Sequence, residues 1–282
     1  MSLPRIGVFD SGVGGLTVLK AISEQMPAHY LYFGDTARLP YGTKSAATVA
    51  RYSIAAALFL QSQDIDLLVI ACNSATALAL PNIKQAARVP VVGVVEPGAA
   101  MAAEVSKTRA AIVIATEATV SSHAYRDALE QHGLQAYEKA CPLLVPLVEE
   151  GWIDHPVTEQ VAKIYLGEAM AQASDKADVL VLACTHYPLI APLLHRITPA
   201  HVRIVDSAES TARVVKRRFQ ADSAGVTGIR SGWSMASSAT SAVAEHRTFR
   251  FYVTDSVEKF KRLAARFLGR QVDHVEHVDL GG

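Results

Sequence analysis

The chain has 282 residues, of which 50% are hydrophobic and 19% are charged, and its formal net charge at pH 7 is zero. This length accommodates one large α/β domain or two domains of about 100–150 residues, and the composition excludes a disordered chain. The balanced charge gives no support to nucleic acid or an anionic membrane surface as a partner.

Strands and helices alternate along the first part of the chain. Strands are expected at 6–9, 31–33, 91–95 and in the apolar run before Cys72. The first of them ends in the glycine turn Asp10-Ser11-Gly12-Val13-Gly14-Gly15. Helices are expected directly after this turn, at about 45–61, and after Asn73 or Ser74, which are N-cap candidates.

The same alternation returns in the second part of the chain. Strands are expected at 111–115, in the apolar run before Cys184 and at 202–206, with helices at about 121–132 and 158–173. Residues 221–244, which are rich in Ser, Ala and Gly, are expected to form a loop or a weak hairpin. A strand at 249–253 and an amphipathic helix at 257–268, ended by Gly269, complete the chain.

The N-terminus and the cysteines predict the cellular compartment. Residues 1–4 run directly into a strand pattern without signal-peptide features, and no apolar run approaches the ~18–20 residues of a membrane span. We therefore expect a cytoplasmic protein with reduced thiols and with neither nucleic acid nor a membrane as a partner. The three cysteines, Cys72, Cys141 and Cys184, have no CxxC spacing, so no disulfide framework and no metal site are predicted.

One stretch of the sequence occurs twice. Asp66-Leu67-Leu68-Val69-Ile70-Ala71-Cys72-Asn73 reappears as Asp178-Val179-Leu180-Val181-Leu182-Ala183-Cys184-Thr185, and the two cysteines are 112 residues apart. We therefore predict an α/β fold of two similar, pseudo-symmetric, doubly wound domains with mostly parallel sheets and the active site between them. The first domain comprises residues 1–96 plus 209–282, and the second comprises residues 97–208.

Polar side chains follow six of the predicted strands. They are Asp10, Cys72, Glu96, Thr116, Cys184 and Asp206. The carboxyl ends of parallel strands line the ligand crevice of such folds. Two sheets that face one another would therefore bring both sets of side chains to a single cleft.

The two repeated cysteines are the strongest functional indication. A lone cysteine is most often a packing residue, and that interpretation suits Cys141. Cys72 and Cys184 each follow a buried strand and precede a predicted helix N-terminus, whose dipole favours the thiolate. Two such thiols suit the inversion of a stereocentre, which needs a base on one face and an acid on the other. A hydrolase or transferase would use one nucleophilic cysteine and leaves the second unexplained.

His186 and Asp10 are candidates to assist proton transfer at Cys184 and Cys72, respectively. A loop histidine is more often a surface or hydrogen-bonding residue, and Asp10 also suits a helix cap, which is compatible with catalysis. The glycine turn lacks the third glycine of GxGxxG, because Thr17 occupies that position, and it lacks the GK[ST] of a P-loop. The turn therefore predicts a small anionic ligand rather than a dinucleotide.

Neutral hydrogen-bond donors are abundant on the loops that border the predicted cleft. They are Ser11, Tyr41, Gly42, Thr43, Asn73, Ser74, Thr116, Thr119 and Thr185. Singly, a loop Ser or Thr is more often a cap or turn residue, but together they suffice to hold two carboxylates and an amine. No lysine context suggests a Schiff base and no spacing suggests a metal, so the residues favour a mechanism without a cofactor.

Five motifs together resemble bacterial glutamate racemases. They are residues 10–17 (DSGVGGLT), 34–42 (GDTARLPYG), 71–76 (ACNSAT), 141–149, which open with Cys-Pro-Leu, and 184–188 (CTHYP). The resemblance implies a cofactor-independent enzyme that interconverts L- and D-glutamate and supplies D-glutamate for peptidoglycan. It implies that Cys184 acts on the L-enantiomer and Cys72 on the D-enantiomer, supported by Asp10, His186 and Glu149. The substrate contacts that it implies are Asp10, Ser11, Tyr41, Gly42, Asn73, Ser74, Thr185 and His186.

The sequence differs from the usual family pattern at two places, and other functions stay open. Ser74 stands where the family usually has Thr, and Ala115-Thr116-Glu117 replaces a more usual Gly-Thr start. A homodimer is expected. Two alternative functions stay open: a racemase of aspartate or another acidic substrate, and a protein that binds DNA gyrase and has racemase activity only as a second function. The balanced charge gives the gyrase alternative no support.

Overall fold

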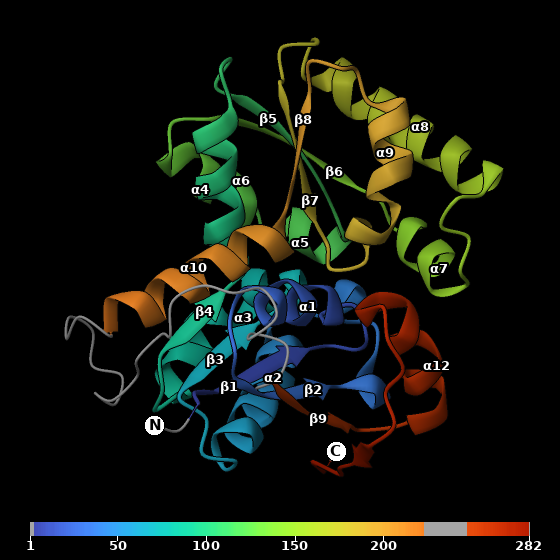
Figure 1. Cartoon of the computed structure of the whole chain (residues 1–282). Helices are drawn as coiled ribbons and strands as arrows, with labels where there is room; N and C mark the ends of the chain where they lie inside the picture. The colour runs from blue at the N-terminus through green and yellow to red at the C-terminus, as the bar shows by residue number, and fades with distance from the viewer. Residues whose placement is uncertain (1–2, 223–246, 282) are drawn as a thin grey trace.

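Two parallel β-sheets form the framework of the molecule (Figure 1). The computed structural model describes residues 3–222 and 247–281, and every strand pairing within these ranges is parallel. The first sheet has the strand order β10-β9-β2-β1-β3-β4, and the second has the order β6-β5-β7-β8. The predicted α/β architecture with parallel sheets is therefore confirmed.

The first sheet combines the N-terminal part of the chain with its C-terminal end. Its strands are β1 (Arg5–Asp10), β2 (His29–Gly34), β3 (Leu67–Ile70), β4 (Val91–Gly93), β9 (Thr248–Val253) and β10 (Val275–His277). The helices around it are α1 (Leu16–Gln25), α2 (Ala46–Gln61), α3 (Asn73–Ala86) and α12 (Val257–Leu268). Two short 3-10 turns, η1 (Thr36–Arg38) and η2 (Tyr41–Thr43), follow β2. Side chains of α1 and α12 share one core cluster, and those of α2 and α3 share another.

The second sheet is formed by the middle of the chain. Its strands are β5 (Ala110–Ala115), β6 (Gln135–Ala140), β7 (Val179–Ala183) and β8 (Arg203–Asp206). The helices around it are α4 (Val95–Val105), α5 (Glu117–Ser121), α6 (Ala124–Gln131), α7 (Leu144–Glu149), α8 (Pro156–Gln172) and α9 (Ala191–Ile197), with the 3-10 turn η3 (Tyr187–Ile190) before α9. Helix α10 (Ser207–Asp222) runs between the two sheets and packs against α1 and α4 (Figure 1).

The two sheets share one topology. Strands β1 to β4 lie in the order β2-β1-β3-β4, and strands β5 to β8 repeat that order as β6-β5-β7-β8. The repeated stretches become β3 and β7, which occupy equivalent places and are each followed by a cysteine. The pseudo-symmetry predicted from the repeat is therefore present at the level of strand order.

The acidic residue that opens each repeat has a structural role. The Asp66 carboxylate accepts a hydrogen bond from the backbone N–H of Arg5 at 2.8 Å, at the start of β1. The Asp178 carboxylate accepts bonds from the Ser106 hydroxyl and from the N–H groups of Lys107 and Thr108, just before β5. Each carboxylate thus ties its own strand to the chain entering the neighbouring strand, and this accounts for the acidic residue in both copies.

One predicted strand end is wrong. The strand expected at 91–95 ends at Gly93, because Val95 already begins α4. Glu96 lies in the first turn of that helix, where a carboxylate interacts favourably with the helix dipole, and Pro97 suits the same turn. The Glu96 side chain bonds the His132 ring at the surface, at 2.8 Å. Glu96 therefore does not lie at the end of a strand.

Other helices and strands differ from the predicted pattern. The helix expected at 121–132 begins only at Ala124, as α6, because His123 has a φ of +56° and separates it from the short helix α5. Strand β6 was not predicted, because it lies at the edge of its sheet and carries the polar side chains Gln135, Glu138 and Lys139. Helices α4, α5, α7, α9 and α10 and strand β10 were not predicted either.

Part of the sequence prediction is not tested by these strands and helices. The loop expected at 221–244 falls almost entirely on residues 223–246, outside the described residues, and its first two positions end α10. The domain boundaries after residues 96 and 208 stay a prediction. Within 3–222 and 247–281, no helix is both long and apolar enough to span a membrane.

Candidate active site

The loops after the strands of the two sheets meet directly. The Thr17 hydroxyl, on α1, donates to the backbone carbonyl of Thr185 at 2.9 Å. Gly14 is packed so closely on the same loop that a Cβ placed there would lie 2.2 Å from the Thr185 Oγ1 and 2.5 Å from the His186 Nδ1. The glycine turn after β1 therefore forms one wall of the site around Cys184, and glycine is required there by space.

Cys72 caps the N-terminus of α3. Its sulfur accepts a hydrogen bond from the N–H of Ala75 at 3.4 Å and lies 3.5 Å from the Ser11 hydroxyl. The residue is 5% exposed. Burial and the neighbouring Asp10 raise the pKa of the Cys72 thiol to about 12, against the opposing effect of these hydrogen bonds. Cys72 is therefore a protonated thiol at neutral pH.

Asp10 lies at the end of β1, beside Cys72. One carboxylate oxygen accepts a hydrogen bond from the N–H of Gly12 at 2.9 Å, whereas the other is buried and has no hydrogen-bond partner among residues 3–222 and 247–281. Burial raises the pKa of Asp10, although the Gly12 bond and the nearby His186 act in the opposite direction. The second oxygen is free to accept a proton or to bind a cationic ligand group.

Cys184 lies beside a histidine whose ring also contacts a carboxylate. The Cys184 sulfur lies 4.0 Å from the His186 Nδ1, and the Nε2 of the same ring lies 3.1 Å from the Glu149 Oε1. Burial lowers the pKa of His186, but the bonds to Cys184 and Glu149 outweigh burial and raise this pKa to about 10. The bond to His186 lowers the pKa of Glu149. An imidazolium therefore stands beside Cys184 at neutral pH.

Three hydroxyl groups from both sheets form a cluster beside Cys72. The Ser74 Oγ lies 2.9 Å from the Thr116 Oγ1 and 3.3 Å from the Thr119 Oγ1, and the two threonine oxygens are 3.0 Å apart. Gly42 packs on Thr116, whose Cβ would lie 3.1 Å from an added Cβ. These residues, which were predicted to bind substrate, are thus brought together, and the Ser74 hydroxyl contacts both threonine hydroxyls.

Two predicted donors have their side chains engaged within the protein. The Tyr41 hydroxyl donates to the buried Asp35 carboxylate at 2.5 Å. The Asn73 side chain bonds the Tyr125 hydroxyl at 2.7 Å and the Ser207 hydroxyl at 3.3 Å. A ligand contact of Tyr41 is therefore left to its backbone N–H, and the amide of Asn73 is held in a fixed orientation.

Two other polar residues at strand ends lie outside this arrangement. Asp206 caps α10, since its carboxylate accepts from the N–H of Glu209 at 2.8 Å. Cys141 is fully buried and its sulfur lies 3.6 Å from the carbonyl of Lys139, in agreement with a packing role. The matched placement of Cys72 and Cys184 therefore separates them from the third cysteine.

Several contributors to the site were not identified from the sequence. They are Thr17, Asp35 and Tyr125, which form hydrogen bonds with Thr185, Tyr41 and Asn73, respectively. Thr17 and Asp35 do fall within the motifs at 10–17 and 34–42, which was the available signal. Tyr125, on α6, had no such signal, because only the tertiary fold brings it to Asn73.

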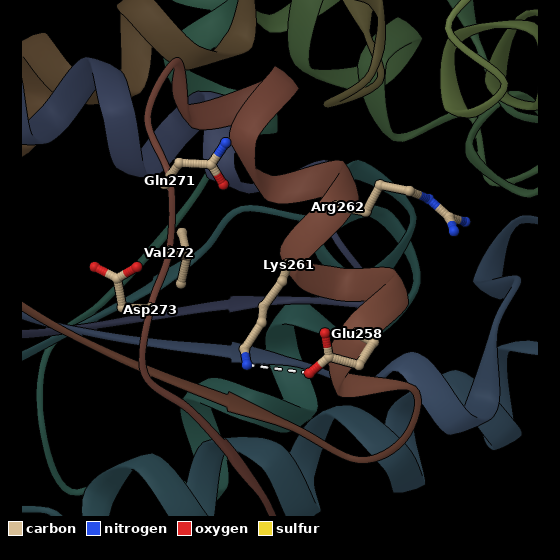
Figure 2. A pocket seen from close by; sticks show the side chains of 6 residues that line it. All are labelled: Glu258, Lys261, Arg262, Gln271, Val272 and Asp273. Atoms are coloured by element: carbon tan, nitrogen blue, oxygen red, sulfur yellow. Dashed lines mark hydrogen bonds and ion pairs between the residues drawn. The ribbon is translucent and has the colours of Figure 1, made fainter.

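A surface depression elsewhere on the molecule is unrelated to this site. It lies beside α12 and is lined by Glu258, Lys261, Arg262, Gln271, Val272 and Asp273 (Figure 2). None of the predicted site residues lines it. Among the described residues, no group of three or more His, Cys, Asp and Glu side chains is arranged to hold a metal ion.

The chain is similar to known racemases in sequence and in structure. A model of the Asp/Glu/Hydantoin racemase family matches residues 6–215. A glutamate racemase from Koribacter versatilis is 61% identical over 99% of this chain and 98% of the relative. Glutamate racemase isoform RacE1 from Bacillus anthracis has a TM-score of 0.85 at 34% identity, with 98% of each chain covered. The Francisella tularensis glutamate racemase in complex with D-glutamate has a TM-score of 0.83 at 31% identity, with 99% of each chain covered.

Proposed function

The chain belongs to the Asp/Glu/Hydantoin racemase family and racemises glutamate, and from this premise we propose that Cys72 and Cys184 are its two acid/base groups. Its product D-glutamate serves peptidoglycan synthesis, a role that follows from the family. The observation that carries the proposal is the placement of one thiol after each of two equivalent strands, β3 and β7.

The reaction moves one proton on each face of the substrate. A Cys184 thiolate takes the Cα proton, so the C–H bond breaks, an S–H bond forms and the electron pair stays on the carbon. The Cys72 thiol gives its proton to the opposite face of Cα, which leaves a thiolate on Cys72. The reverse direction starts from that state, so each cysteine is the base for one enantiomer and the acid for the other.

The electrostatics of the two halves support this division. The pKa of about 12 keeps Cys72 as a thiol, ready to donate. The charge of His186, 4.0 Å from Cys184, and a thiolate on Cys184 stabilise one another. The Cys72 thiol is thus the proton donor of the proposed L-to-D direction, in which the resemblance makes Cys184 the base. For the other direction, the neighbouring Asp10 raises the pKa of Cys72 and so makes the Cys72 thiolate a stronger base.

Glutamate offers an ammonium group and two carboxylates to the same loops. We assign the ammonium to the second carboxylate oxygen of Asp10, which is buried and has no partner within the described part of the chain. The carboxylates go to the neutral donors that border the two thiols. The proposed contacts are Ser11, the backbone of Tyr41 and Gly42, Asn73, Ser74, Thr116, Thr119, Thr185 and His186.

Exchange and substitution test the two-thiol assignment. In deuterated water, without added cofactor, the protein should incorporate solvent deuterium at Cα of glutamate. Because acid/base groups contribute about 10²–10⁴-fold, Cys72→Ser and Cys184→Ser should each lose racemisation by that factor. Cys141→Ala is the matched control and should retain activity. Near-normal turnover in both directions would remove the substituted thiol from the mechanism.

Selectivity among acidic amino acids is also a proposal. We propose glutamate over aspartate, because the same residues must hold two carboxylates at a fixed separation and aspartate is shorter by one methylene. Equal kcat/KM values for the two amino acids would contradict this selectivity without contradicting the thiol chemistry.

Assembly and location are finer proposals. Of the six exposed large hydrophobic side chains among the described residues, four lie around α7 and α8: Leu143, Trp152, Val157 and Ile164. We propose that this surface forms a homodimer interface. The three free cysteines support a cytoplasmic location, where thiols stay reduced. Sedimentation of the Ile164→Lys variant tests the surface, since an unchanged dimer would place the interface elsewhere. Nothing in the charge balance favours DNA gyrase as a partner.

A further inference from the structure

The C-terminal helix α12 reaches from the first sheet to the acid/base group of the second. It packs against α1 and β10, which belong to the first sheet and its surrounding helices. Its final turn nevertheless contacts both members of the His186–Glu149 pair, which follow β7 and end α7. The contacts come from two adjacent residues, Arg266 and Phe267.

Arg266 caps the helix that carries Glu149. Its guanidinium donates to the backbone carbonyl of Glu149 at 2.9 Å and to that of Val148 at 3.4 Å. The last carbonyls of a helix have no partner within the helix, so a cation placed there satisfies them and interacts favourably with the dipole. Arg266 therefore fixes the end of α7, from which the Glu149 side chain extends to His186.

Phe267 holds the other member of the pair. Its ring centroid lies 5.1 Å from that of His186, and the two ring planes meet at 82°. Phe267 is 2% exposed, so the histidine ring is backed by a fixed aromatic side chain. An edge-to-face pair has a preferred geometry, so this contact restricts the orientation of the imidazole ring.

We propose that Arg266 and Phe267 are positioning residues for racemisation, which hold Glu149 and His186 in the geometry that serves Cys184. The inference rests on the proposed role of that cysteine. It makes the acid/base chemistry of one half of the molecule depend on a helix from the other half. Lys259, on the same helix, adds little, because its Nζ is 3.9 Å from the Glu149 Oε2 and its side chain is half exposed.

Phe267→Leu tests the inference against Phe260→Leu. Both residues are 2% exposed on α12, but Phe260 packs on Tyr32 and Phe251 in the core. We expect Phe267→Leu to lower kcat/KM about tenfold more than the control. The decrease must be equal in both directions for every variant, because the two enantiomers have equal free energies.

Isotope effects separate positioning from general damage. The kinetic isotope effect on kcat/KM is measured for each enantiomer deuterated at Cα. If proton transfer at Cys184 becomes slower, this isotope effect should rise for the enantiomer that Cys184 deprotonates and fall for the other. His186→Asn calibrates the direction of this asymmetry, and Phe267→Leu should shift the two isotope effects the same way. Equal changes for both enantiomers, or kinetics indistinguishable from those of Phe260→Leu, would overturn the inference.

An exposed substitution keeps the test valid if Phe267→Leu does not fold. Arg266→Gln removes the cap of α7, and Arg262→Gln, at the depression of Figure 2 on the same helix, is its control. Arg266→Gln should show the same isotope asymmetry, and its absence would overturn the role of Arg266. Wild-type kinetics in His186→Asn would instead contradict the proposed function. A response at His186 without one at Arg266 or Phe267 would contradict only this inference.

Discussion

Adding one methyl group at Gly14 should misplace His186 and Thr185 without changing the fold. The φ angle of Gly14 is not in the left-handed region, so alanine is sterically allowed by the backbone and only space opposes it. The new Cβ would lie 2.2 Å from the Thr185 Oγ1, 2.5 Å from the His186 Nδ1 and 2.6 Å from its Cε1. Ordinary contacts begin near ~3.5 Å, so the imidazole must recede by about 1 Å.

That displacement moves the imidazole beside Cys184, where the rate of proton transfer depends on the positions of the reacting groups. A misplacement of about 1 Å costs on the order of 100-fold in rate, so kcat/KM of Gly14→Ala should fall by that factor. The assay is racemisation followed by circular dichroism in both directions, with thermal unfolding to confirm the fold.

Gly167→Ala is the matched control for the added methyl. Gly167 lies inside α8 and an added Cβ would meet nothing within 4 Å. This variant should keep full activity and gain about 0.5–1 kcal/mol of stability, because alanine favours the helix interior. A folded Gly14→Ala variant with kcat/KM within about threefold of wild type would refute the argument that this glycine sets the position of His186.

Three further variants test individual groups. Glu149→Gln should lower kcat/KM about tenfold and move the alkaline limb of its pH profile to lower pH, because the raised pKa of His186 depends partly on Glu149; an unmoved limb would contradict this. Tyr41→Phe should lower the unfolding free energy by about 1–3 kcal/mol in urea titrations, while a large rise in KM would show that the hydroxyl does contact glutamate. The pKa of Asp178 is about 2, since its hydrogen bonds outweigh burial, so its stabilisation is present above about pH 4 and is lost as the pH falls through 2. The stability difference between wild type and Asp178→Asn, about 2 kcal/mol at neutral pH, should therefore shrink over that interval, and a constant difference would contradict the assignment.

The strand pattern and the repeat were readable from the sequence because parallel strands are buried on both faces. Such strands need uninterrupted apolar runs, and those before Cys72 and Cys184 became β3 and β7. The order of the motifs also indicated which loops border the site, since β-strand carboxyl ends meet at one edge of a sheet. Strand β6, which has polar residues at the edge of its sheet, gave no such pattern.

Several contacts between polar side chains were decided only by the tertiary structure. Glu149 and His186 are 37 residues apart in sequence and meet because α7 and the loop after β7 pack together. Glu96 had the sequence context of a strand end, yet the chain turned into α4 before reaching it. Local sequence determines which segments bury an apolar face, because that depends on residue spacing. Long-range packing determines which charges and hydroxyls come within hydrogen-bonding distance, and so it made Cys72 and Cys184 chemically unequal.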